Sequence, residues 1–153
     1  MPLKKISQSS SSSLRFPFAA IPKSGAHHQV ANGIHWCRHD LPFALDHINT
    51  WLLQDHDKWV IVDTGVSDDR SQDGWRNILD GELSGSEISK IIVTHYHPDH
   101  IGNADWLSKR SLASVWMSSS EFLTAHAVFD KTATHSAQAT GALFRQHGLP
   151  DDE

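Results

Sequence analysis

Three histidines and one carboxylate fall within six consecutive positions, in the stretch HYHPDH formed by residues 95–100. Only Thr94 separates the stretch from the apolar run IIV, and Ile101 and Gly102 follow it. Imidazole nitrogens and carboxylate oxygens are ligands that suit zinc, and they suit iron or manganese less selectively. The alternative, a histidine-rich surface turn without chemistry, does not explain why these groups stand beside an apolar strand. The residue types and their spacing therefore predict a metal site.

The local geometry expected for this stretch brings its side chains together. In an extended chain, residues i and i+2 point to the same side, so His95 and His97 should converge. Asp99 and His100 follow Pro98 at the turn into a helix and can point back into the same crevice. Ligands commonly bind at the carboxyl ends of strands in open α/β sheets. Four such groups on two short backbone pieces crowd one tetrahedral ion, so they are expected to divide between two adjacent metals.

The elements that must position these residues alternate along the chain. Apolar runs predict strands at about 30–39 (with a turn or kink at Asn32-Gly33), 48–54, 58–63, 90–95 and 114–117. Capping residues and helical periodicity predict helices at about 67–81, 98–110, 118–129 and 132–147. The second and third strands form a hairpin, and Ser118 with Glu121 forms a capping-box pattern. The order β-β-β-α-β-α-β-α-α predicts an α/β domain with a mixed sheet and flanking helices.

HYHPDH and the upstream VDTG of residues 62–65 together resemble the metallo-β-lactamase-fold metallo-hydrolases, a superfamily that includes the glyoxalase II-like enzymes. The order of the predicted elements agrees with this family over about residues 30–115. The resemblance implies that the chain is the N-terminal half of an αββα sandwich, with metals at one edge of two sheets.

The same resemblance implies a role for each site residue. His95 and His97 would bind the first of two zinc ions, and Asp99 and His100 would bind the second. A metal-bound hydroxide would attack a small ester, thioester, lactone or lactam whose carbonyl oxygen a metal polarises. Asp99 would hold this nucleophile as the catalytic residue, and Asp63 would orient a ligand or a nearby loop from behind. The alternative for Asp63 is a strand-end carboxylate that accepts N–H bonds of the turn.

The resemblance also implies ligands that lie outside this stretch: a histidine in a Gly-His context, a bridging aspartate and a distal histidine. The later histidines are His126, His135 and His147, and none of them follows a glycine. Residues 26–153 are therefore interpreted as a metallo-β-lactamase-like domain that is truncated at its C-terminus, with weak metal binding and little activity alone.

The last two predicted helices carry several large apolar residues, namely Phe122, Phe129, Leu143 and Phe144. Their helical spacing favours packing against other helices or the sheet. The alternative is that they line a pocket, because many relatives insert a substrate-side cap at this position.

Three other functions compete with the zinc hydrolase. They are an iron-dependent persulfide oxidoreductase of the same fold, a nuclease, and a non-catalytic chain with a partial metal site. The net charge of −5 and the absence of Lys/Arg clusters disfavour nucleic acid. A small-molecule substrate is the expected partner; the sequence gives no oligomeric state.

The remaining features bear on location. No apolar run is long enough to span a membrane, so no membrane partner is expected. Cys37 is the only cysteine, which excludes an internal disulfide and fits a reducing, cytoplasmic compartment. Residues 1–25 carry lysines, a serine tract and no acidic residue. This segment is predicted to be a disordered leader, and the alternative is a transit peptide.

Overall fold

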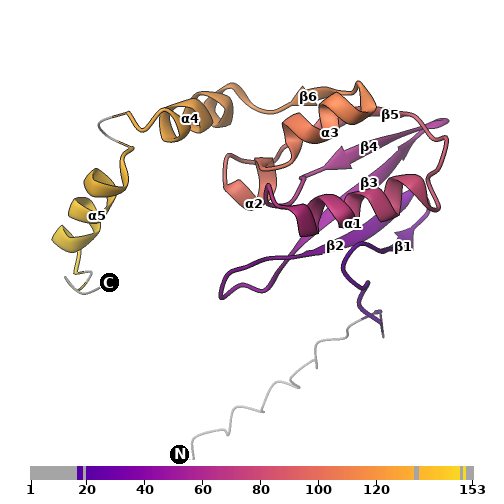
Figure 1. The fold of residues 1–153 in the computed structure, drawn as a ribbon, viewed down its shortest axis with the longest axis horizontal. Coiled ribbons are helices and arrows are strands. Elements are labelled where there is room, and N and C mark those ends of the chain that lie inside the picture. The colour runs from indigo at the N-terminus through magenta and orange to yellow at the C-terminus, as the bar shows by residue number, and fades with distance from the viewer. Residues whose placement is uncertain (1–16, 19, 133–134, 149, 151–153) are drawn as a thin grey trace, which may run out of the picture.

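The computed structural model describes residues 17–18, 20–132, 135–148 and 150, and a mixed sheet with flanking helices organises them (Figure 1). In chain order its elements are β1 (His27–Ala31), β2 (Ile34–Asp40), β3 (His47–Asp55), β4 (Lys58–Val62), α1 (Asp69–Asp80), β5 (Ile88–Ile92), α2 (Pro98–Ile101), α3 (Ala104–Ser111), β6 (Ser114–Trp116), α4 (Ser119–Phe129) and α5 (Ala137–Gln146). The predicted alternation of strands and helices is confirmed.

The strands lie in the sheet in their chain order, from β1 to β6. The first four pair antiparallel through hairpins, whereas β5 and β6 join the sheet in parallel. Each parallel step is reached through helices, α1 before β5 and the α2–α3 pair before β6. Gly33 turns the chain with a φ of 70°, so the single strand expected over 30–39 is two strands joined at Asn32-Gly33.

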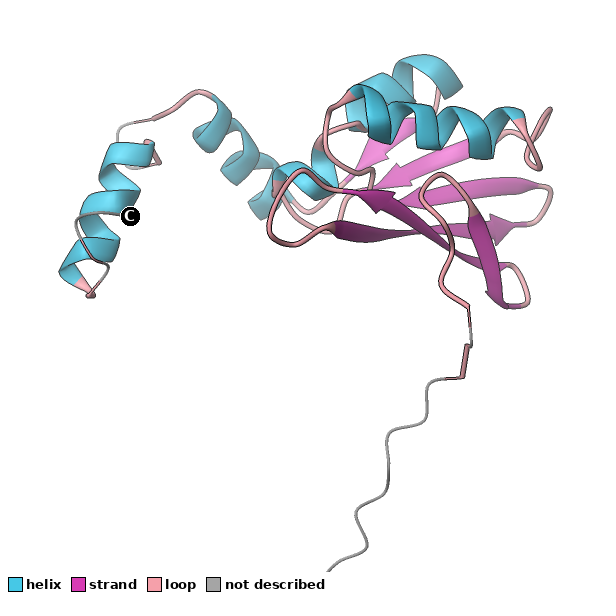
Figure 2. Cartoon of the chain, turned by 60° about the horizontal axis from the view of Figure 1, so that its bottom comes forward, coloured by secondary structure: helices cyan, strands magenta, loops and turns pink. Residues whose placement is uncertain are grey.

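One face of the sheet is covered and forms the core. Leu52, Ile61 and Ile91 are direct cross-strand neighbours in β3, β4 and β5, and each has no exposed surface. Helix α1 contacts β2, and α3 contacts β5 and β6; both helices lie over the same side of the strands (Figure 2). Trp75 of α1 and Leu107 of α3 are fully buried in this layer. Burial of these side chains is the main stabilisation of the fold.

The opposite face of the sheet is apolar but largely uncovered in the described part of the chain. Trp36, Trp51, Val62, Ile92 and Trp116 are successive cross-strand partners from β2 to β6. The exposed fraction is 36% for both Trp51 and Ile92, and 56% for Trp116. Alternation of the pleat places this row opposite the core row. A sheet with two apolar faces suits a sandwich in which a second layer covers the second face.

Two predicted helices differ from those observed. The helix expected over 98–110 is interrupted at Gly102 and Asn103, and therefore forms α2 and α3. The last helix was expected from about Thr132, but it begins at Ala137, because the Ser136 side chain caps it by accepting the Ala139 N–H. Both differences arise from side-chain contacts that periodicity does not reveal.

Most of the predicted leader lies outside the described residues, so its disorder and any targeting role stay predictions. Within the part that is described, Gly25 N donates to Arg38 O at 3.1 Å and Ser24 Oγ accepts from Asp40 N at 3.2 Å. None of the helices in the described ranges has the length and apolar character needed to cross a bilayer.

A buried histidine lies between the sheet and α1. His39 has no exposed surface, and its ring packs against that of Trp75, with centroids 4.7 Å apart and the planes tilted by 33°. Its Nε2 lies 3.2 Å from Thr50 Oγ1, while its Nδ1 is buried without a hydrogen-bond partner. Burial lowers the pKa of His39 to about 4, although Asp40 and Asp68 act in the opposite direction. The neutral imidazole is therefore the form that the folded chain holds.

Acid should destabilise the fold through His39. Its folded pKa lies below the unfolded value of 6.5, so the unfolded chain binds more protons between about pH 6.5 and 4, and stability falls as the pH drops through this window. We expect a loss of about 2 kcal/mol from this group between pH 7.5 and 5. Urea unfolding at several pH values measures it, and His39→Gln should flatten that part of the profile. An unchanged slope in the variant would contradict this assignment.

Candidate metal centre

The HYHPDH stretch ends the loop between β5 and α2 and continues into the first three residues of α2, at the carboxyl ends of the parallel strands β4 and β5 (Figure 1). His97 is the N-cap of α2, and Pro98 occupies its first turn, where the missing N–H of proline costs no hydrogen bond. The loop leaves the sheet beside Asp63, which ends the neighbouring strand segment. The structure thus brings all five predicted site residues to one edge of the sheet.

The four predicted ligands lie in two close pairs. His95 Nε2 is 3.0 Å from His97 Nδ1, and His100 Nε2 is 3.5 Å from Asp99 Oδ2. Two ligands of one tetrahedral zinc ion, each at about 2.1 Å, lie roughly 3.4 Å apart. Each pair therefore has the separation that two ligands of a shared ion need. The rings of His95 and His100, which belong to different pairs, are 3.9 Å apart between centroids.

A full set of ligands is not assembled. In the residues that the structure describes, no three or more His, Cys, Asp or Glu side chains form a group that could hold a metal ion. The donor types fit zinc, manganese or iron. Each pair would supply two of the four ligands of a tetrahedral ion, and further donors would have to complete the coordination of each ion.

Asp63 lies beside the two pairs of predicted ligands and is hydrogen-bonded to His100, a member of the second pair. Its side chain is 7% exposed, and Oδ2 accepts from His100 Nδ1 at 2.8 Å. Oδ1 accepts the backbone N–H of Thr94 at 2.8 Å, and the Thr94 hydroxyl bonds the same carboxylate. A carboxylate on one ring nitrogen directs the other nitrogen outward, as is usual for metal-binding histidines. Asp63 thus holds the imidazole of His100 and also accepts a backbone N–H bond at the strand end, so its contacts agree with both interpretations.

His95 has the environment of a neutral imidazole. Burial lowers its pKa, and the neighbouring rings of His100 and His97 lower it further, against the opposite effect of Asp63 and Asp99. Its Nδ1 lies 3.0 Å from Thr94 Oγ1, which leaves Nε2 directed to His97. Because a metal ion binds the deprotonated nitrogen, a lowered pKa favours binding near neutral pH.

Buried polar residues that sequence reasoning did not single out hold this edge in place. Thr64 donates from both N and Oγ1 to His100 O, at 2.9 and 2.7 Å. Asn103 Nδ2 donates to Thr64 O at 3.2 Å and to Val66 O at 2.6 Å, and Trp75 Nε1 also donates to Thr64 O. The Gly-Asn dipeptide inside a predicted helix was the signal that could have pointed to Asn103.

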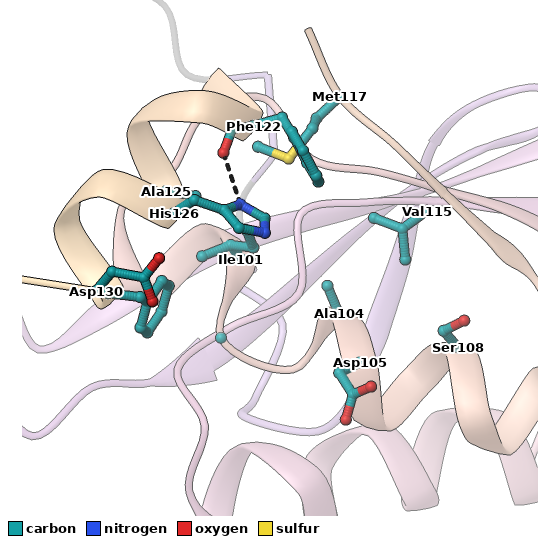
Figure 3. A pocket seen from close by; sticks show the side chains of 12 residues that line it. Ile101, Ala104, Asp105, Ser108, Val115, Met117, Phe122, Ala125, His126 and Asp130 are labelled. Atoms are coloured by element: carbon teal, nitrogen blue, oxygen red, sulfur yellow. Dashed lines mark hydrogen bonds between the residues drawn. The ribbon is translucent and has the colours of Figure 1, made fainter. Parts of the chain in front are cut away.

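A pocket of about 640 Å³ lies beside the metal-centre loop, between α4 and the α2–α3 pair (Figure 3). Its lining is mainly apolar and includes Ile101 of α2, Val115 of β6, and Phe122 and Phe129 of α4. Phe122 and Phe129 are 49% and 64% exposed. In the described part of the chain these two side chains therefore line an open pocket, which was the alternative, and the favoured packing against other helices or the sheet is not seen for them.

Comparison with known proteins defines the class. The sequence matches the Metallo-beta-lactamase superfamily over residues 44–149. Over 65 residues it is 35% identical to the Beta-lactamase-like protein 2 homolog of Caenorhabditis elegans, covering 42% of this chain and 21% of that protein. Over 71 residues it is 35% identical to the probable metallo-hydrolase YybB of Bacillus subtilis, covering 46% of this chain and 30% of that protein.

A solved structure of a beta-lactamase domain protein from Burkholderia ambifaria matches with a TM-score of 0.73 and 37% identity, covering 88% of this chain and 42% of that one. The chain therefore belongs to the metallo-β-lactamase superfamily, whose members are mostly hydrolases that bind metal ions. Its mixed sheet corresponds to the N-terminal portion of that fold. The matched regions are less than half the length of these relatives.

Proposed function

We propose that the chain supplies part of the active site of a zinc-dependent hydrolase acting on a small ester, thioester, lactone or lactam. The observation that carries the proposal is the arrangement of donors in two pairs, at 3.0 and 3.5 Å, with Asp63 holding Nδ1 of His100 so that Nε2 faces Asp99. Membership of the superfamily supports it, as does the likeness to a probable metallo-hydrolase.

In this proposal each residue has a role that its contacts support. His95 and His97 would hold one ion, and Asp99 and His100 would hold a second, while Asp63 keeps His100 in the required orientation. Bound zinc would lower the pKa of water and polarise a carbonyl oxygen. The Asp99 carboxylate would accept the proton of the attacking water and carry it to the leaving group, since a partly exposed carboxylate can serve as general base and acid. The pocket beside α2 offers an apolar wall near this edge.

The second candidate is a non-catalytic chain with a partial metal site. It is favoured by the absence of any convergent set of three donors among the described residues. The two candidates differ in whether metal binding by this chain is accompanied by turnover.

Metal titration tests the proposal. We expect the wild-type chain to bind zinc and the variant His95→Ala/His97→Ala to bind it much more weakly. Loss of a residue that only supports a ligand lowers metal affinity roughly 10–100-fold, and loss of two ligands should lower it further. A matched control is His28→Ala/His147→Ala, which removes two exposed histidines outside the centre. Elemental analysis of the purified chain separates zinc from iron or manganese.

Hydrolysis of a nitrophenyl ester, a thioester and a lactone, with and without chelator, then separates the two candidates. Chelator-sensitive turnover that is lost in Asp99→Asn supports the hydrolase. Equal zinc affinity in the wild type and the His95→Ala/His97→Ala variant would exclude the proposed centre.

A further inference from the structure

The backbone N–H between the proposed ligands His95 and His97 is hydrogen-bonded by a carboxylate from a distant part of the chain. His95 and His97 lie on either side of Tyr96, and the N–H of Tyr96 donates to Oε2 of Glu121 at 3.0 Å. Glu121 belongs to the first turn of α4, 25 positions later in the chain. The conformation at Tyr96 decides whether the two histidine side chains point to the same side.

This contact has a counterpart on the other side of the loop. Regular pairing of β5 continues until Val93, whose N–H donates to Trp116 O of β6 at 2.9 Å. Beyond that point, the N–H of Thr94 donates to the Asp63 carboxylate, which follows β4, and the N–H of Tyr96 donates to Glu121, which follows β6. A carboxylate therefore follows each of the two strands that flank β5. Each carboxylate accepts one backbone N–H of the metal-centre loop.

Glu121 was predicted to take part in a capping box at the start of α4, but its carboxylate bonds the metal-centre loop instead. Half of the box forms, because the N–H of Glu121 donates to Ser118 Oγ at 3.3 Å. The other half would turn the Glu121 carboxylate back to the N–H of Ser118. Its Oε2 instead accepts the N–H of Tyr96, so the residue serves the metal-centre loop in addition to its own helix.

We propose that Glu121 is a positioning residue, which fixes the loop at Tyr96 and thereby keeps His95 and His97 together. The inference rests on the proposed function for its consequence, which is metal affinity. Without this acceptor the Tyr96 N–H must turn towards water, and the peptide planes on either side of it reorient. The two histidines then lose the 3.0 Å approach that prepares them to bind one ion.

Three variants of the chain test the proposal. Glu121→Ala removes the acceptor, Glu121→Gln retains an acceptor oxygen, and Ser118→Ala weakens the cap of α4 while leaving Glu121 in place. Two properties are measured in each: hydrogen exchange of the Tyr96 amide in the metal-free chain, and affinity for Co²⁺ followed by its absorption. We expect Glu121→Ala to accelerate Tyr96 exchange at least about tenfold and to weaken Co²⁺ binding about 10–100-fold. Glu121→Gln should restore most of both.

Each outcome is decisive. Unchanged Tyr96 exchange in Glu121→Ala, or an equal change in Ser118→Ala, would overturn the inference. Faster exchange with unchanged Co²⁺ affinity would overturn it as well, because the loop would then bind metal without Glu121. If the wild type and His95→Ala/His97→Ala bind Co²⁺ equally, the proposed function fails, and the exchange data alone decide whether Glu121 holds the loop.

Discussion

Replacement of Asp63 by alanine is expected to lower the free energy of unfolding by about 2–4 kcal/mol. The variant leaves three donors without their acceptor, namely Thr94 N, Thr94 Oγ1 and His100 Nδ1. Asp63 also has a φ of 61°, a left-handed conformation that aspartate and asparagine tolerate better than alanine does. Urea unfolding followed by tryptophan fluorescence measures the change.

Asp63→Asn separates these two contributions. Asparagine keeps the shape and the tolerance for positive φ, but its NH₂ group faces donors where the carboxylate offered an acceptor. We expect its cost to be intermediate. Asp57→Ala is the matched control: this exposed aspartate lies in the hairpin turn between β3 and β4, and its loss should change stability by no more than about 0.5 kcal/mol. Equal stability of Asp63→Ala and Asp57→Ala would show that the hydrogen bonds of Thr94 and His100 to Asp63 do not stabilise the fold.

Much of the architecture could be predicted because apolar alternation and capping residues act locally. The apolar run over 58–63 predicts a strand, and β4 forms there with Val60 and Ile61 buried. Capping residues also predict the start of a helix at about residue 67, and Asp68 is the N-cap of α1, since its Oδ1 accepts the Ser71 N–H at 2.7 Å. At the metal centre, the rule that i and i+2 share a side led to the 3.0 Å approach of His95 and His97.

What could not be predicted depends on contacts between distant parts of the chain. The helix expected over 98–110 breaks because Asn103 turns its amide to Thr64 O and Val66 O, which lie 39 and 37 positions earlier. A lone asparagine in a helical pattern does not specify such partners. Glu121 is a similar case, since the capping box explains its position and only the fold reveals its bond to Tyr96. The residue types of the proposed ligands can be read from the sequence, whereas the residues that hold those side chains in place cannot.

These supporting contacts join two loops into one unit. The segment after β4 and the turn between α2 and α3 exchange bonds in both directions, since Thr64 donates to His100 O while Asn103 N donates to Gly65 O and Thr64 Oγ1. Asp63 and His100 add a side-chain bond to this arrangement. Because the bonds are buried and satisfied together, loss of one member should disturb the others. The positions of Asp63 and His100 in the proposed metal centre therefore depend on the close approach of the two backbones.

The closest approach is at Gly102, and its replacement by alanine is expected to lower the free energy of unfolding by about 3 kcal/mol or more. A Cβ at this position would lie 2.6 Å from Ser67 N and 2.8 Å from Gly65 O, in addition to 2.4 Å from Pro98 O. All three are backbone atoms, which cannot rotate away as a flexible side chain would. The loops must separate, and the bonds of Thr64 and Asn103 must lengthen or break.

The matched control for this substitution is Gly141→Ala. Gly141 lies within the exposed helix α5, where the three atoms nearest to an added Cβ all belong to the Arg145 side chain, at 3.4 Å or more. Alanine there should be neutral or stabilising by up to about 1 kcal/mol, since it favours the helix. Urea unfolding compares the two variants, and zinc titration reports the centre directly. Because the ligands of Gly102→Ala are unchanged, weaker zinc binding in that variant would show that the approach of the two loops sets the positions of the ligands. Stability and zinc affinity equal to those of Gly141→Ala would instead mean that the two loops can separate without consequence for the site.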